Sequence, residues 1–545
     1  MRHEKGWFKD LVIYQIYPRS FMDANGDGIG DIQGMTQKLD YLQSLGVNAV
    51  WMSPVYASPN VDNGYDISDY CSIMEEFGTM EDWEEFRDQA HKRGIAVIMD
   101  LVLNHTSDRH PWFQESKKSR DNAYSDYYVW RDPSPEGKEP NGWQSVFGGS
   151  AWEYVPERGQ YYLHFFAKEQ PDLNWENEKA KADIMDVIRF WNEKGVDGYR
   201  IDAISYLDKG LDGRADMTQV FGTAACANLE GTHRQIRSMI GQMMEPDQLM
   251  TVGEVIGDTT EDLWNYTSAS RGEFNMAIPF VAPVVELETW SPERMKERLA
   301  AEYEALKEDG WWARFFSNHD KPRQVSLYGD DGKYWKQSAK MLAALLHTLP
   351  GTPFIYQGEE IGMTNIRFDS IEEYDDIDTR NYYQEQLRSG VSAKEALRRA
   401  GNISRDNART PMQWEDAPNG GFTKGEPWLA VNQNFCRINV AAQEQDAGSI
   451  LNFYRRLTGL RKENPIMAHG DFKLLSPAEG PVVAYERCLG EKKWIVIHNF
   501  SSQPASFTYR GLDKGEVLLC SWEAEEPLSE ELALRPYESL IVEMA

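Results

Sequence analysis

Cysteine is scarce in this sequence and shows no paired spacing. Five cysteines are scattered over 545 residues, and no Cys-x-x-Cys pair occurs. An odd number of widely spaced cysteines argues against a disulfide framework. We therefore expect the cysteines to be reduced and the protein to be cytoplasmic.

Long apolar runs and an excess of basic residues are also missing. No window approaches the ~20 apolar residues of a membrane-spanning helix, and the first 20 residues lack the apolar core of a signal peptide. Lysine and arginine number 57 against 87 aspartates and glutamates, for a net charge of −30. Such a charge repels nucleic acid and anionic membranes, so we expect neither as a partner. The oligomeric state is not fixed by the sequence, and a monomer is favoured.

Aromatic residues, by contrast, are plentiful. They make up 12% of the chain, with 18 tryptophans and 26 tyrosines. This abundance fits either a large aromatic core or a sugar-binding cleft, in which ring faces stack on pyranose faces. A chain of this length exceeds one compact core and indicates two or three domains.

Short apolar runs alternate with amphipathic stretches along most of the chain. Such alternation predicts a parallel sheet, and eight units indicate a closed (β/α)8 TIM barrel. A doubly wound open sheet is the alternative, but no Gly-x-Gly-x-x-Gly loop follows an early strand. The predicted strands are 11–18, 48–55, 95–105, 196–203, 249–255, 274–280, 311–320 and 352–360. The predicted helices are 36–46, 80–94, 180–195, 229–244, 292–307, 333–349 and 449–463.

Two segments interrupt this alternation. Residues 106–174 are rich in Trp, Tyr, Gly and Pro and show no clean helical pattern, which indicates a small inserted domain after the third strand. From residue 469 onward, short apolar runs separated by turn residues predict an antiparallel β domain. The predicted fold class is therefore α/β, with a barrel formed by 1–105 and 175–468. The inserted domain is 106–174 and the C-terminal β domain is 469–545.

Polar residues stand at the ends of the predicted barrel strands. In "VDGYRIDAISYL" (196–207), Arg200 and Asp202 point to the same side of a strand because side chains alternate. Burying an arginine and an aspartate is costly unless the two groups form an ion pair or take part in catalysis. Active sites of TIM barrels lie at the carboxyl ends of the strands. The other polar residues at such ends are Asp100, Asn104, His105, Glu254, His319 and Asp320.

A cluster of carboxylates at one end of a barrel indicates glycoside hydrolysis. One carboxylate attacks the anomeric carbon while a second, protonated carboxyl group gives a proton to the leaving oxygen. Neighbouring like charges raise one pKa and keep that acid protonated near neutral pH. Arg200 beside Asp202 would hold the nucleophile ionised and oriented. Each residue alone has an ordinary structural explanation, such as a helix cap, so the prediction depends on their clustering.

Several segments together resemble the α-amylase superfamily, glycoside hydrolase family 13. "DLVLNH", "GYRIDA", "GEV" and "SNHD" occur in the order of the four signature regions of that family. "QPDLNW" (170–175), "SPVYASPNVDNGYDISDY" (53–70) and "SRDNARTPMQW" (404–414) resemble its oligo-1,6-glucosidase and α-glucosidase branch. The resemblance covers essentially the whole chain. It implies a retaining exo-acting α-glucosidase that removes glucose from short oligosaccharides in two steps, and no organic cofactor.

The resemblance also implies a role for individual residues. Asp202 is then the nucleophile, Glu254 the general acid/base, and Asp320 the third carboxylate, which binds sugar hydroxyls. His105, His319 and Arg200 line the subsite of the sugar under attack, where Ala203 follows the nucleophile. Asp62 and Arg409 bind hydroxyls at the closed end, and Tyr65 stacks on that sugar ring.

The loop "DANGDGIGD" (23–31) has the composition of a divalent-cation site. Asp23, Asn25, Asp27 and Asp31 offer oxygen ligands at alternating spacing, which suits Ca²⁺ or Mg²⁺. The twelfth position is glycine rather than glutamate, so the loop is not an EF-hand. The resemblance implies a structural cation bound by these four side chains and the Ile29 carbonyl. A plain Asx turn without metal remains the alternative.

Two departures from the family pattern bear on the linkage that is cleaved. Oligo-1,6-glucosidases of this branch usually carry valine directly after the nucleophile, where this chain has Ala203. The stretch 280–295 also looks short and lacks a Lys–Trp–Asp segment. Both features favour α-1,4 substrates such as maltose over α-1,6 substrates. A change of methyl size alters specificity by only ~1–3 kcal/mol, so α-1,6 cleavage stays open.

Other functions within the family also remain open. A trehalose or trehalose-6-phosphate hydrolase shares this scaffold, but no basic patch at the pocket rim is evident in the sequence. A sucrose isomerase or transglucosylase would carry an Arg-Leu-Asp-Arg type loop after "HDKPR" (319–323), which is absent. A non-catalytic relative would allow lost carboxylates and predict a membrane helix, and this chain shows neither.

Overall fold

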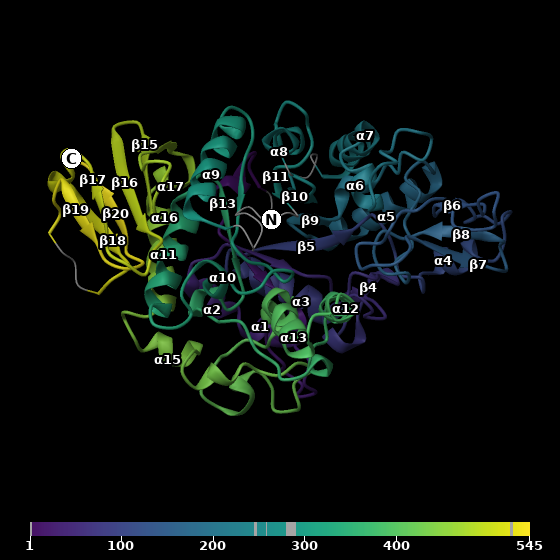
Figure 1. The fold of residues 1–545 in the computed structure, drawn as a ribbon, viewed down its shortest axis with the longest axis horizontal. Coiled ribbons are helices and arrows are strands. Elements are labelled where there is room, and N and C mark those ends of the chain that lie inside the picture. The colour runs from purple at the N-terminus through teal and green to yellow at the C-terminus, as the bar shows by residue number, and fades with distance from the viewer. Residues whose placement is uncertain (1–2, 245–247, 258, 280–289, 524–526) are drawn as a thin grey trace.

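The computed structural model describes residues 1–545 except 1–2, 245–247, 258, 280–289 and 524–526. Eight parallel strands form the central sheet in the order β11-β10-β9-β5-β2-β1-β13-β12, and the two end strands contact each other. The TIM barrel predicted from the sequence is therefore confirmed (Figure 1). Its strands are β1 (Ile13–Ile16), β2 (Ala49–Met52), β5 (Ala96–Val102), β9 (Gly198–Asp202), β10 (Met250–Val255), β11 (Met276–Pro279), β12 (Ala313–Arg314) and β13 (Thr352–Tyr356).

Apolar residues on both faces of these strands explain why the sheet is buried on both sides. Every residue of the eight strands is buried, as expected for a parallel sheet covered by helices. The main surrounding helices are α1 (Ile32–Gln37), α2 (Leu39–Leu45), α3 (Met80–Lys92), α5 (Glu178–Lys194), α7 (Glu230–Met239), α8 (Thr260–Thr267), α9 (Pro292–Leu306), α10 (Gln324–Tyr328), α11 (Trp335–Thr348) and α16 (Ile450–Glu463).

Several elements differ from the sequence prediction. The strand expected at 311–320 is regular only over β12, and the helix expected at 36–46 is divided at Lys38 into α1 and α2. Helix α8 was not predicted, and neither were α12 (Ile377–Arg388) and α13 (Ala393–Ile403). Helix α12 escaped prediction because only Thr379 among its twelve residues is buried, so no apolar stripe marks it.

The segment inserted after β5 lies at one end of the molecule (Figure 1). It contains the antiparallel sheet β6-β8-β7, made of β6 (Trp130–Arg131), β7 (Trp152–Val155) and β8 (Gln160–Leu163). One short helix, α4 (Pro111–Ser116), corrects the expectation of no helix in this segment. An isolated bridge between His105 and Asp172 connects the end of the insertion to the end of β5.

The C-terminal segment lies on the opposite side of the barrel (Figure 1). Its antiparallel strands confirm the predicted β domain. The larger sheet has the order β14-β15-β16-β20-β18, and β17 pairs with β19. The strands are β14 (Asp471–Leu474), β15 (Val482–Leu489), β16 (Lys492–Asn499), β17 (Ala505–Thr508), β18 (Glu516–Cys520), β19 (Glu531–Leu534) and β20 (Ser539–Glu543). The domain boundaries given above stay a prediction.

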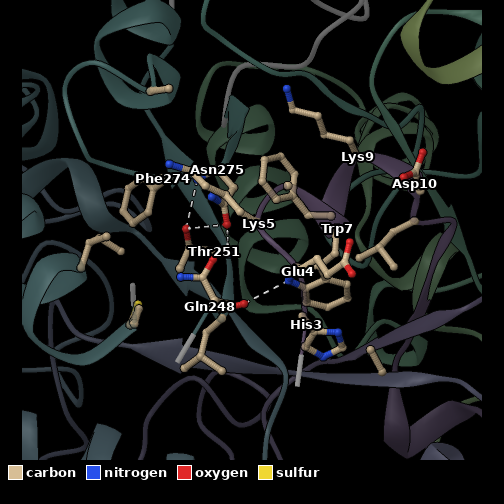
Figure 2. Close-up of a pocket in the computed structure, with 18 of the residues that line it drawn as sticks. His3, Glu4, Lys5, Trp7, Lys9, Asp10, Gln248, Thr251, Phe274 and Asn275 are labelled. Carbon is tan, nitrogen blue, oxygen red and sulfur yellow. Dashed lines mark hydrogen bonds between the residues drawn. The ribbon is translucent and has the colours of Figure 1, made fainter. Parts of the chain in front are cut away.

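The barrel is hollowed at both ends. At the amino ends of its strands, a cavity of 1040 Å³ lies beneath the N-terminal segment. Figure 2 shows Trp7 donating a hydrogen bond to the Gln248 carbonyl there, and Thr251 bonded to Asn275. The predicted catalytic residues lie at the other end, around a cavity of 290 Å³. Since barrel enzymes use the carboxyl end of the strands, the smaller cavity is the candidate active site.

Candidate active site

One arginine, which does not itself line this cavity, holds three carboxylates together beside it. Arg200 Nη1 donates to Asp202 Oδ1 at 2.7 Å and to Asp100 Oδ1 at 2.8 Å. Its Nη2 donates to Glu254 Oε1 at 2.7 Å. All four side chains are buried. The predicted pairing of Arg200 with Asp202 is therefore present. The same guanidinium also contacts Glu254, which lies on the neighbouring strand β10.

This arrangement has a direct consequence for protonation. Burial, together with the adjacent Glu254 and Asp100 carboxylates, raises the pKa of Asp202 although Arg200 lowers it. Burial likewise raises the pKa of Asp100 against the effect of Arg200. Asp202 and Asp100, beside one guanidinium, therefore tend to retain a proton between them. A nucleophile and a proton donor side by side require one ionised and one protonated carboxyl group.

Asp320 is held in the opposite state. It accepts hydrogen bonds from Arg409 Nη2 at 2.8 Å and pairs with His319 Nε2 at 3.0 Å. Burial alone would raise the pKa of Asp320, but His319, Arg405 and Arg409 hold it well below its usual range. His319 is in turn fixed by Gln15 at 2.8 Å and by the Tyr65 hydroxyl at 2.6 Å. Asp320 is thus an ionised acceptor suited to sugar hydroxyls.

Asp62, Tyr65 and His105 lie where the sequence predicted, on the wall of the cavity. Burial raises the pKa of Asp62 to about 6 despite the nearby Arg405 and Arg409. Burial and Lys209 lower the pKa of His105 to about 3, so its imidazole is neutral. The Asp62 Oδ1 atom is buried, has no hydrogen-bond partner among the described residues and lies 3.6 Å from Arg405 Nη2. Tyr65 also stacks on His319, with ring centroids 5.4 Å apart.

The two arginines of "SRDNAR" lie differently relative to the cavity, and the role predicted for Arg409 stays a prediction. Arg409 is buried behind Asp320 and donates to Asp320 and to the His319 carbonyl. Arg405 lines the cavity instead, 3.6 Å from Asp62 and 3.5 Å from Asp320. It was missed because two arginines four residues apart on one helical turn cannot be ranked by spacing alone.

Other lining residues were also not predicted from the sequence. Most of them are apolar. Ala203, which the sequence did predict, has a left-handed backbone with φ of 46°. The Ala203 N–H donates to Glu254 Oε2 at 3.3 Å, so this turn links the nucleophile to the second carboxyl group. The stretch 280–289, on which the linkage argument partly depends, lies outside the described residues. The unpredicted lining residues are Val146, Phe147, Phe166, Ile278, Pro279, Asn318, Lys321, Pro322, Asp378, Ile403 and Arg405.

A buried lysine joins the inserted segment to the barrel beside this cavity. Lys209 Nζ donates to Asp172 Oδ2 at 2.7 Å and to Asn104 Oδ1 at 2.6 Å. Asn104 Nδ2 lies 3.3 Å from both Asp172 Oδ1 and His105 Nδ1. Lys209 therefore connects the loop after β9, the "QPDLNW" segment and the His105 ring. No spacing rule in the sequence could have indicated this contact.

The loop 23–31 forms a compact turn with two buried carboxylates, Asp23 and Asp31. Asp23 accepts from the Gly26 and Gly28 amides, and Asp31 accepts from Ala24, Asn25 and Gly34. Among the described residues, no three His, Cys, Asp or Glu side chains converge as a metal-binding group. A cation here would depend on the Asn25 amide and main-chain carbonyls as well. The donor set is all oxygen, which fits Ca²⁺ or Mg²⁺.

Comparison with known proteins accounts for this arrangement. Residues 15–470 match the family model of the α-amylase catalytic domain, and residues 482–541 match that of the C-terminal domain of the α-amylase SusG. The chain belongs to the α-amylase family. It is a glycoside hydrolase. Among the described residues, no helix has the length and apolarity needed to cross a membrane.

The relatives place it in the branch expected from the sequence. It is 46% identical to the oligo-1,6-glucosidase of Parageobacillus thermoglucosidasius, over 99% of both chains. The trehalose-6-phosphate hydrolase structure from Bacillus licheniformis superimposes with a TM-score of 0.93 at 41% identity, covering 98% of this chain and 99% of that one. An isomaltulose synthase from Protaminobacter rubrum has a TM-score of 0.93 at 40% identity, covering 99% and 100%. α-Glucosidase chemistry is thus supported. These relatives differ in their named substrates, so they do not determine the linkage that this chain cleaves.

Proposed function

We propose that the protein is a retaining, exo-acting α-glucosidase that releases glucose from α-1,6-linked glucooligosaccharides such as isomaltose. The observation that carries the hydrolytic chemistry of this proposal is the contact of one guanidinium, that of Arg200, with both Asp202 and Glu254. The ion pairs of Arg405 with Asp62 and Asp320 support a pocket that is closed behind a single sugar. A closed pocket favours removal of terminal units.

In the proposed mechanism, Asp202 attacks the anomeric carbon while Glu254 transfers its proton to the glycosidic oxygen. The bond to the leaving sugar breaks and a glucosyl–Asp202 ester forms. Glu254, now ionised, takes a proton from a water molecule that attacks the same carbon and releases glucose. Arg200 stays in contact with both groups, so the negative charge that moves between them remains compensated. Asp320 and Asp62 accept hydrogen bonds from the sugar hydroxyls.

The α-1,6 linkage is proposed against the preference for α-1,4 that the sequence suggested. Four relatives named oligo-1,6-glucosidase share 46% identity over 98–99% of this chain. Ala203 argues for α-1,4, but its effect is bounded at ~1–3 kcal/mol. A bound of this size leaves α-1,6 cleavage open to a chain with alanine at that position.

Hydrolysis of a phosphorylated disaccharide is a second candidate. Lys321 lines the cavity beside Asp320, and it is a cation that the sequence alone did not identify as part of the pocket. A relative from Bacillus subtilis that is 42% identical is named trehalose-6-phosphate hydrolase. Asp378 lines the same cavity, and its charge would oppose a phosphate. This candidate is therefore placed second.

The deciding experiment measures glucose release from isomaltose, maltose and trehalose 6-phosphate by the purified protein, with Asp202→Asn as the inactive control. The proposal expects the highest kcat/KM for isomaltose and no release by the variant. Faster release from maltose would reverse the linkage, and faster release from trehalose 6-phosphate would favour the second candidate. Undiminished activity of the variant would remove Asp202 as nucleophile. An Ala203→Val variant then shows whether this position alters the isomaltose-to-maltose ratio.

We further propose that the 23–31 loop binds a structural Ca²⁺ or Mg²⁺ through Asp23, Asn25, Asp27, Asp31 and the Ile29 carbonyl. Burial, with Asp23 nearby, raises the pKa of Asp31 although three amides lower it. A cation would compensate these two buried charges. It would act on stability, because the loop does not line the 290 Å³ cavity. Metal content of the protein as purified, measured by mass spectrometry, tests the proposal.

A further inference from the structure

Among the described residues, two segments that are distant in sequence meet at the mouth of the active-site cavity. One is the loop of the inserted segment that carries Val146 and Phe147. The other is the hairpin of α12 and α13, which contributes Asp378 and Ile403. Asp378 is exposed, and Ile403 is 37% exposed, so both lie at the open side. In an exo-acting enzyme, the open side receives the leaving sugar.

Helix α12 is attached to the rest of the protein mainly by polar contacts. Only Thr379 among its residues is buried, and the helix packs along α13 (Figure 1). Its N-cap residue, Asp376, accepts two hydrogen bonds from Arg405, at 2.9 and 2.7 Å. An element with so little buried apolar surface has low local stability, so individual polar contacts decide its position.

One such contact crosses the mouth of the cavity. Asn381 Nδ2 donates to the Phe147 carbonyl at 3.0 Å. The Phe147 ring lies under the Arg405 guanidinium at 5.3 Å from its centroid, so the loop, the helix and the cavity wall meet at this point. Asn381 is also one turn after Asp378, and residues three apart lie on the same face of a helix. A bond at Asn381 therefore fixes the direction in which Asp378 faces.

We propose that Asn381 is a positioning residue: its bond to the Phe147 carbonyl holds α12 across the mouth and orients Asp378 toward the leaving sugar. The inference rests on the proposed exo-α-glucosidase function. Asp378 then acts as a hydrogen-bond acceptor for the second sugar, and Asn381 acts only through it. The selectivity for the leaving sugar is thus set partly by a contact between the inserted segment and α12.

The test compares a disaccharide with α-glucosyl fluoride, whose leaving group is too small to reach the mouth. We expect Asn381→Ala to lower kcat/KM for the preferred disaccharide by about three- to tenfold, mainly through KM, as for one lost hydrogen bond. Hydrolysis of α-glucosyl fluoride should stay within about twofold. Asn381→Asp, which keeps the shape but cannot donate, should show the same loss. Gln384→Ala, exposed on the same helix and away from the cavity lining, is the matched control.

A double variant separates positioning from a general structural effect. If Asn381 acts through Asp378, then Asn381→Ala adds little to the loss already caused by Asp378→Ala. Additive losses, unchanged disaccharide kinetics, or parallel loss with α-glucosyl fluoride would each overturn the proposal. Wild-type protein that cleaves neither substrate would instead refute the proposed function. Equal thermal unfolding of the variants and the wild type excludes misfolding as the cause.

Discussion

Replacing Lys209 with methionine tests how the inserted segment is joined to the barrel. Lys209 is 7% exposed, and Asp172, its ion-pair partner, is fully buried. The variant keeps the aliphatic packing but leaves the Asp172 carboxylate, among the described residues, with the Phe165 amide and the Asn104 side chain as its donors. Removing one partner of a buried ion pair costs about 3–5 kcal/mol. We therefore expect the free energy of unfolding at pH 8 to fall by about that amount.

The pH dependence of this loss distinguishes charge from packing. Burial already raises the pKa of Asp172 in the wild type, and Lys209 lowers it. Without the lysine the folded-state pKa rises further above the unfolded value, so the penalty grows as the pH increases and shrinks when Asp172 is protonated. The deficit should accordingly be smaller at pH 5 than at pH 8. Adding Asp172→Asn should recover much of it.

Urea unfolding at both pH values, followed by tryptophan fluorescence, measures the effect. Lys307→Met is the control, since Lys307 forms an exposed i,i+3 pair with Glu304 and should change stability by less than about 1 kcal/mol. Isomaltose hydrolysis should also weaken in the Lys209 variant, because Asn104 contacts both Lys209 and His105. A deficit below about 1 kcal/mol, or one equal at both pH values, would refute the reasoning.

Three further predictions follow from the same geometry. Glu254→Gln should lower kcat for isomaltose by about 10²–10⁴-fold. It should lower kcat for α-glucosyl fluoride less, because fluoride leaves without a proton. Equal losses of kcat for both substrates in steady-state assays would contradict the acid role of Glu254. Burial raises the pKa of Glu359 from 4.5 to about 8, so the contribution of this one group to stability is fully present below pH 4.5 and is lost, by roughly 3–5 kcal/mol, as the pH rises to about 8. Glu359→Gln should flatten this decline in urea titrations, and an unchanged slope would exclude Glu359 as its source. Removal of divalent cations with EDTA should lower the melting temperature of the wild type, and Asp23→Ala should abolish that response. A wild-type melting temperature that EDTA leaves unchanged would argue against a bound cation.

The sequence by itself determined the barrel and the main chemical groups. Buried parallel strands read as continuous apolar runs, so polar residues within them, such as Arg200 and Asp202, stand out. Their positions at strand ends predicted that barrel closure would bring them together, and Asp202, Glu254 and Asp320 do line one cavity. Helix α12 was missed for the complementary reason: it is polar on nearly all sides and has no periodic apolar pattern.

Only the tertiary structure decided which charged side chains contact the same ion-pair or hydrogen-bond partner. Arg200 contacts three carboxylates from three strands, Arg405 rather than Arg409 reaches the cavity, and Lys209 joins residues 37 and 105 positions away. These contacts depend on side-chain directions across different strands and loops, which no local spacing encodes. Linkage specificity has the same origin, because differences of ~1–3 kcal/mol arise from the shape of the whole mouth. A sequence therefore identifies the reacting groups more readily than the sugar that they select.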